Sequence, residues 1–134
     1  MEIEKQKKDL LWETIHGQVP SKSNSYLAVP DSAGGRRIIK NDKVRDYERS
    51  FARQCTLYKG RHICRPFNLH AVVYESTHSY DLDNAFKSIL DCLQYAGAIT
   101  NDNLCIGINA RKAIDRQNPR VTFAIEEIEP RLNF

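Results

Sequence analysis

The segment between residues 66 and 111 restricts the possible fold more than any other part of the chain. Apolar residues alternate with more polar ones from Pro66 to Glu75, which predicts a strand. A helical pattern follows from Leu82 to Tyr95, with Gly97 placed to end the helix. A second alternation predicts a strand over 104–111, with one face formed by Leu104, Ile106, Ile108 and Ala110.

The flanking segments complete the expected domain. We predict strands over 12–19 and 120–128, and a helix over 42–57 with an apolar stripe of Val44, Tyr47, Phe51 and Cys55. Residues 20–40 are expected to form an irregular loop, and residues 1–11 an N-terminal extension or short helix before a domain spanning 12–134. This order predicts an α+β fold in which two main helices pack on a small mixed sheet.

An acidic motif opens the second helix. Asp81 stands at its start, and Asp83 and Lys87 share a solvent-facing surface one turn apart. Asp102 follows a loop that begins at the far end of this helix, so it can approach the other two aspartates only if the sheet folds it back. Clustered carboxylates in a basic protein indicate a divalent metal facing a phosphate backbone, because Mg²⁺ prefers oxygen ligands.

Each member of this motif also has an ordinary structural interpretation. Asp81 could simply cap the helix, since it would accept from unpaired N–H groups. Asp83 and Lys87 could form an exposed ion pair contributing ~0.3–0.5 kcal/mol. Asp102 could be a turn residue beside two asparagines.

The basic residues are unevenly distributed. The whole chain carries a net charge of +3, but ten basic and only three acidic residues lie between Arg36 and Arg65. Within the helix predicted over 42–57, Arg45, Arg49 and Arg53 recur every four residues and form a basic stripe. Such a surface attracts a polyanion in a salt-dependent way. The alternative is a solvated helix face.

Bulk properties exclude several classes of protein. With 134 residues, one domain is expected, and no apolar run approaches the ~18 residues of a membrane span. The polar N-terminus does not resemble a secretory signal. The four cysteines form no CxxC pair and are interpreted as free thiols of a reducing cytoplasm. A zinc site at Cys55, His62 and Cys64 matches no usual ligand spacing.

Taken together, these motifs resemble the RusA family of Holliday junction resolvases. The resemblance rests on Asp81-x-Asp83-Asn84-x-x-Lys87, on Asp102 before a strand carrying Lys112, and on Pro20-Ser21-x-x-Asn24-x-Tyr26, and it spans about 15–128. Two departures are Asn101 before Asp102, where members often have a second acid, and the absence of an arginine run before Asp81.

The resemblance implies a homodimeric, bacterial or phage-encoded enzyme of the cytoplasm that binds four-way DNA. It would nick two opposing strands with Mg²⁺ or Mn²⁺ and use no small-molecule cofactor. Family aspartates matching Asp81, Asp83 and Asp102 form the metal site, and a lysine matching Lys87 is needed for cleavage. We expect further DNA contacts from Lys22, Asn24, Arg36, Arg37, Arg45, Arg49, Arg53 and Lys112.

Other functions remain open at this level. A close variant is a nuclease for other branched DNA, such as flaps or forks. A DNA-binding module without activity is a second alternative, but binding a polyanion gains nothing from three clustered aspartates. A protein interaction domain with structural aspartates is a third, against which the basic helix argues.

Overall fold

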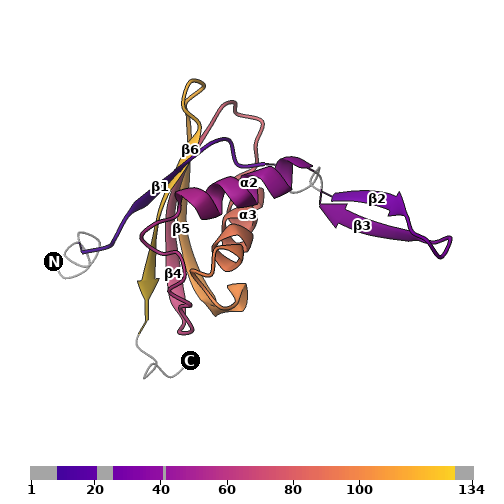
Figure 1. The fold of residues 1–134 in the computed structure, drawn as a ribbon. Coiled ribbons are helices and arrows are strands. Elements are labelled where there is room, and N and C mark those ends of the chain that lie inside the picture. The colour runs from indigo at the N-terminus through magenta and orange to yellow at the C-terminus, as the bar shows by residue number, and fades with distance from the viewer. Residues whose placement is uncertain (1–8, 21–25, 41, 129–134) are drawn as a thin grey trace.

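The protein folds around a four-stranded mixed sheet with two helices on one face (Figure 1). The computed structural model describes residues 9–20, 26–40 and 42–128. The strand order is β1-β6-β4-β5, and the bounds are Glu13–His16 for β1, Arg120–Glu127 for β6, Phe67–Glu75 for β4 and Cys105–Ile114 for β5. The helices are α2 (Asp42–Gln54) and α3 (Leu82–Tyr95). The predicted α+β fold with two main helices on a small mixed sheet is confirmed.

A β-α-β unit forms the centre of the fold. Strands β4 and β5 are parallel, with Phe67 beside Cys105 at one end and Glu75 beside Ile114 at the other. Helix α3 connects them, so it begins near the C-terminal end of β4 and returns the chain to the start of β5. The two ends of α3 therefore lie at opposite ends of the strands β4 and β5.

The core lies between the sheet and the two helices. Along β4, the side chains of Phe67, Leu69 and Val73 are fully buried, as their alternation predicted. Phe51 of α2 stacks on Phe123 of β6 with a centroid distance of 5.7 Å. Helix α3 contributes Ile89 and Leu93, and it begins and ends at the predicted residues. Gly97 follows it with φ +73°, a conformation that favours glycine at a helix end.

Glu13 joins the first strand to the end of α2. Its carboxylate accepts hydrogen bonds from the main-chain N–H groups of Thr56 (2.6 Å), Leu57 (3.0 Å) and Tyr58 (3.3 Å). Burial alone would raise the pKa of Glu13, but these donors hold it below its usual value. Helix α2 ends at Gln54 rather than at 57. Cys55 still donates its N–H to the carbonyl of Phe51, and the three residues after Cys55 donate theirs to Glu13.

The irregular loop expected over 20–40 is wrong for most of its length. Residues Tyr26–Pro30 (β2) and Arg36–Lys40 (β3) form an antiparallel hairpin that projects away from the main sheet in Figure 1. Asp31 Oδ1 closes its turn by accepting from the N–H groups of Ala33 and Gly35, both at 2.9 Å. The segment was missed because none of the side chains whose burial is described, Ala28 to Ile38, is buried in the core, so burial imposes no apolar alternation on them.

Strand boundaries differ from prediction in two further places. The strand predicted over 12–19 extends only over Glu13–His16, because the chain turns at Gly17 (φ +118°). Strand β5 is longer than predicted, and an irregularity in its register opposite Phe67 and Asn68 leaves Ile106 without a partner on β4. Because β5 is the sheet's edge strand, Ile106 and Ile108 remain 49% and 42% exposed.

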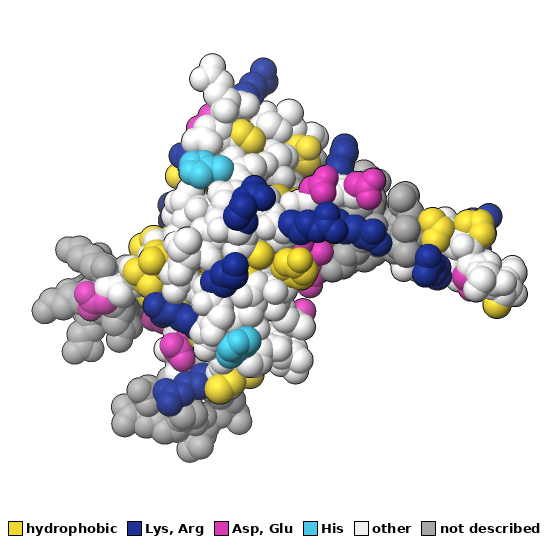
Figure 2. Space-filling view, viewed as in Figure 1, with side chains coloured by type: hydrophobic (Ala, Val, Ile, Leu, Met, Phe, Trp, Pro, Cys, Tyr) yellow, Lys and Arg dark blue, Asp and Glu magenta, His cyan; other side chains and the backbone are white. Residues whose placement is uncertain are grey.

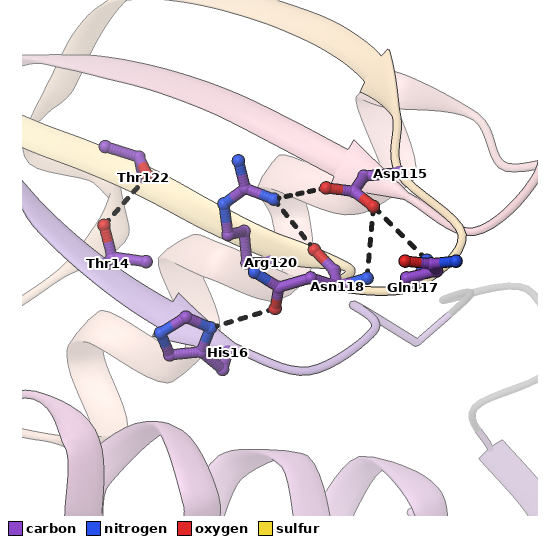
Figure 3. Close-up of polar contacts among 7 residues, drawn as sticks. All are labelled: Thr14, His16, Asp115, Gln117, Asn118, Arg120 and Thr122. Atoms are coloured by element: carbon purple, nitrogen blue, oxygen red, sulfur yellow. Dashed lines mark hydrogen bonds and ion pairs between the residues drawn. The ribbon is translucent and has the colours of Figure 1, made fainter.

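A network of hydrogen bonds in the β5–β6 turn lies next to the C-terminal end of β4 (Figure 3). Asp115 accepts from Arg120 at 2.9 Å and from the N–H groups of Gln117 and Asn118 at 3.2 Å. The Arg120 side chain and these N–H groups hold the pKa of Asp115 below its ordinary value. Asp115 also donates its own N–H to the carbonyl of Glu75 at 2.9 Å. The last residue of β4 is thus tied to this turn.

Two further predictions concern the N-terminal extension and membrane spans. Of the predicted N-terminal extension, residues 9–11 are described and carry no helix or strand, while residues 1–8 lie outside the described part. None of the described helices is both long enough and apolar enough to cross a membrane.

Candidate active site and nucleic-acid interface

Asp81 occupies the N-cap position of α3 without acting as a cap. Its backbone is extended (φ −82°, ψ 134°), and its side chain makes no capping hydrogen bond. The carboxylate is exposed, and its one side-chain hydrogen bond with a described residue is long, 3.5 Å from the Asn84 amide. The simple capping interpretation therefore does not account for this residue.

Asp83 and Lys87 lie one helical turn apart on the exposed side of α3. Neither makes an ion pair within 4 Å of any described residue, including each other. The alternative of a structural ion pair is thus not supported. Both side chains are exposed in the first two turns of the helix that Asp81 precedes, where they are accessible to a ligand.

Asp102 and Asp81 lie at opposite ends of the parallel strands β4 and β5. It begins the short 3-10 helix η2 (Asp102–Leu104) directly before β5, and its N–H donates to Gln94 near the C-terminal end of α3. Because β4 and β5 are parallel, Asp102 is separated from the end of β4 by on the order of 25 Å, the length of nine strand residues. Across residues 9–20, 26–40 and 42–128, no three acidic, His or Cys side chains form a group able to hold a metal.

One chain therefore offers two carboxylates for a cation, those of Asp81 and Asp83. Exposed carboxylate oxygens fit Mg²⁺ or Mn²⁺, because Mg²⁺ is commonly held by one or two carboxylates with waters and substrate phosphates. The donor set at the start of α3 thus fits the expected group, while Asp102 of the same chain is not part of it.

Glu75 is a further acidic residue near this site that sequence reasoning missed. It ends β4 on the buried face and is only 1% exposed, and its Oε2 atom has no hydrogen-bond partner among the described residues. Burial raises the pKa of Glu75, the charge of Lys112 opposes this rise, and Asp81 adds to it. The sequence did contain a signal for it. Glu75 continues the every-second-residue series of Phe67, Leu69 and Val73, so a carboxyl group stands at a position where a buried apolar side chain is expected.

Lys112 contacts the loop that leads to Asp81. Its ammonium donates to the carbonyl oxygens of Tyr80 at 2.9 Å and His78 at 3.3 Å. This residue was expected to contact DNA, but two of its three N–H donors point at the main chain.

Basic side chains cover α2, as its sequence predicted. Arg45, Arg49 and Arg53 are exposed, and Figure 2 shows a row of Lys and Arg side chains over this helix. Arg49 makes only a weak contact of 4.0 Å with Asp46. Arg36 and Arg37 are exposed on β3, whereas Lys22 and Asn24 lie outside the described residues.

The cysteines are free thiols. Cys55 is buried and donates to Glu13, and burial followed by the Glu13 charge raises its pKa to about 12. Cys64 is exposed. These contacts do not support a zinc site at Cys55, His62 and Cys64.

Comparison with known families identifies the domain. The family model described as endodeoxyribonuclease RusA matches residues 17–126, which include β4, α3 and β5 with all three aspartates. The chain belongs to the RusA family of endodeoxyribonucleases. The predicted resemblance is confirmed, and membership makes the chain an endodeoxyribonuclease, an enzyme class that hydrolyses phosphodiester bonds within DNA strands.

A characterised relative supports the same assignment. Over 110 residues this RusA-family chain is 26% identical to the crossover junction endodeoxyribonuclease RusA of Aquifex aeolicus (strain VF5). The match covers 81% of this chain and 84% of the relative, so the similarity extends over nearly the whole of both proteins.

Proposed function

We propose that this protein is a Mg²⁺- or Mn²⁺-dependent nuclease that resolves Holliday junctions by paired nicks in opposing strands, during DNA recombination and repair. The observation that carries the proposal is the trio of Asp81, Asp83 and Lys87 at the start of α3. All three are exposed, and none is used in a cap or an ion pair with a described residue. Family membership supports the reaction class, and the Aquifex aeolicus relative's name supports the junction as substrate.

The proposed chemistry assigns one role to each side chain. When bound, Mg²⁺ or Mn²⁺ supplies Lewis acidity toward the scissile phosphate and makes a water nucleophilic near neutral pH. Asp81 and Asp83 hold the cation with negative oxygen ligands. Lys87, one turn further along α3, places an ammonium beside the same phosphate and stabilises the negative charge that develops on it. The basic surface keeps the DNA backbone at the site.

A second copy of the chain would supply the third aspartate. Asp102 precedes β5, at the opposite end of the parallel strands from Asp81 and Asp83. The proposed three-aspartate site therefore cannot assemble within one chain. We therefore infer a homodimer in which Asp102 of the partner subunit completes each site. Two identical sites related by a two-fold axis also match the symmetry of two opposing strands.

The open edge of β5 favours a specific arrangement of the two copies. No described strand pairs with the outer side of β5, and its apolar residues Ile106 and Ile108 are exposed, a combination that favours pairing with another chain. Two β5 edges related by a two-fold axis pair antiparallel. The start of one β5, which carries Asp102, then lies beside the end of the other, where α3 begins. Pairing of the two β5 edges would thus create two composite sites, each with Asp81 and Asp83 from one chain and Asp102 from the other.

DNA binding is assigned to the basic surface. We infer that Arg45, Arg49 and Arg53 of α2 contact phosphates, with Arg36 and Arg37 of the hairpin extending this surface. Lys22 and Asn24 lie outside the described residues, and we propose them as further contacts because they belong to the opening segment that resembles the RusA family. The free thiols are consistent with action in a reducing bacterial cytoplasm.

A cleavage assay tests the function directly. End-labelled four-way junction, flap, fork and linear duplex are incubated with the protein in Mg²⁺ or in chelator. We expect symmetric nicks in the junction, dependent on the cation, and little cleavage of linear duplex. Preferential cleavage of flaps or forks would replace the junction as substrate, and binding without cleavage in Mg²⁺ or Mn²⁺ would leave only a DNA-binding module.

A further inference from the structure

Lys112 is anchored on the main chain directly in front of Asp81. The hydrogen bonds to Tyr80 and His78 join β5 to the loop over 76–80, and Tyr80 is the residue before Asp81. The peptide that carries the Asp81 carboxylate is therefore held from the neighbouring strand. The other end of this loop is fixed as well, since Ser76 donates its N–H to Gln18 at 2.8 Å.

Glu75 lies at the end of β4, and its buried Oε2 atom has no hydrogen-bond partner among the described residues. Lys112 is in register with Val73, so the side chains of Lys112 and Glu75 leave adjacent strands on the same face of the sheet. No ion pair within 4 Å joins these two residues in the structure, yet the positive charge of Lys112 acts on the pKa of Glu75 against the effect of burial. Lys112 therefore supplies a positive charge that opposes the effect of burial on Glu75.

We propose that Lys112 and Glu75 form a positioning pair that sets the orientation of Asp81 for cation binding. The proposal rests on the cation site of the proposed function. Lys112 acts through the carbonyl groups of the loop, and Glu75 keeps the ammonium directed toward the protein. Neither residue touches the cation or the DNA.

The cost of releasing Lys112 explains why it does not act as a phosphate contact. Movement toward DNA would leave two carbonyl groups without their donor and would take the positive charge of Lys112 away from Glu75. One exposed phosphate contact contributes modestly to affinity and does not offset the loss of both hydrogen bonds. The same restraint benefits the site, because a ligand held in one orientation binds a cation without first having to be ordered.

Cation binding in the absence of DNA tests the pair. Mn²⁺ affinity of the full chain is measured by electron paramagnetic resonance for wild type, Lys112→Met, Lys112→Arg and Asp83→Asn. We expect Lys112→Met to weaken Mn²⁺ binding by about 10- to 100-fold, the effect typical of residues that orient metal ligands. Lys112→Arg, which keeps the charge and the donors, should retain most of the affinity.

Junction binding in chelator separates positioning from phosphate contact. If Lys112 acts on Asp81, the slope of log affinity against log salt stays unchanged in Lys112→Met. A phosphate contact would instead reduce that slope by about one, and this result would overturn the proposal. Lys112→Met should also melt at a lower temperature than wild type, and adding Glu75→Gln should reverse much of the loss. Strict additivity of the two substitutions would likewise contradict a coupled pair.

Asp83→Asn distinguishes failure of the pair from failure of the site. Loss of Mn²⁺ binding in Asp83→Asn but not in Lys112→Met would overturn the positioning pair alone. Full Mn²⁺ affinity in Asp83→Asn would overturn the cation site of the proposed function and the pair's role with it.

Discussion

Phe67 and Cys105 face each other in parallel register, at the opposite ends of β4 and β5 from Glu75 and Ile114. This pairing decides where the acidic residues lie. Asp102 precedes Cys105 by three residues and must stay near the start of β4, while Asp81 follows the end of β4. The separation is a property of the β-α-β connection, so local loop movement does not remove it.

Two inactive variants should therefore restore one active site when they are combined. In a heterodimer of Asp83→Asn and Asp102→Asn, one composite site carries both substitutions and the other carries neither. We expect each homodimer to be inactive and the doubly tagged, co-purified heterodimer to nick one strand of a junction. No recovery of nicking in a verified heterodimer would mean that each site is built within one chain.

Binding and cleavage should separate at Asp83. Asp83→Asn removes a cation ligand and also a negative charge near the DNA, so junction cleavage should be abolished while binding stays equal or becomes tighter. Asp91→Asn removes the same charge two turns along α3 and serves as the control, with cleavage retained. Gel-shift and cleavage assays in Mg²⁺ measure both properties, and wild-type cutting by Asp83→Asn would refute the cation site.

The arginines of α2 should bind DNA without reading its sequence. Replacing Arg45 and Arg49 with Ala should weaken binding to every junction sequence and lower the slope of log affinity against log salt by about two, one for each lost phosphate contact. Arg116→Ala, an exposed arginine on the β5–β6 turn, is the matched control and should leave the slope unchanged. An unaltered slope in the double variant would point to a different DNA surface.

Glu13 should make stability depend on acid pH. Its pKa is lowered in the folded protein, so its contribution is present above the ordinary value of 4.5 and is lost as the pH falls through the folded-state pKa. Glu13→Gln keeps the shape but not the charged acceptor, and should lower the free energy of unfolding at pH 7 by about 3 kcal/mol. Its stability should also decline less between pH 5 and pH 3.

Denaturant unfolding across that pH range measures both effects. Glu127→Gln, an exposed glutamate on β6, is the control and should behave as wild type. Parallel pH profiles for Glu13→Gln and wild type would show that the N–H groups after α2 do not depend on this carboxylate.

The sequence by itself determined the elements whose periodicity reflects burial. Strand β4 and helix α3 were predicted to within one residue, because every second side chain of β4 and one face of α3 must enter the core. The acidic motif and the basic stripe were also visible, since both depend on spacing along one helix. The β2–β3 hairpin was not, because its side chains from Ala28 to Ile38 are not buried in the core and hydrogen bonds to Asp31 close its turn.

Only the tertiary structure decided how these pieces meet. The direction of β5 relative to β4 places Asp102 away from Asp81, and the edge position of β5 leaves Ile106 and Ile108 exposed although they alternate like core residues. The Lys112 anchor, and the Glu75 Oε2 atom that has no hydrogen-bond partner among the described residues, arise where two strands and a loop converge. Periodicity along a chain records which side chains are buried, whereas strand pairing between distant segments fixes which charges become neighbours.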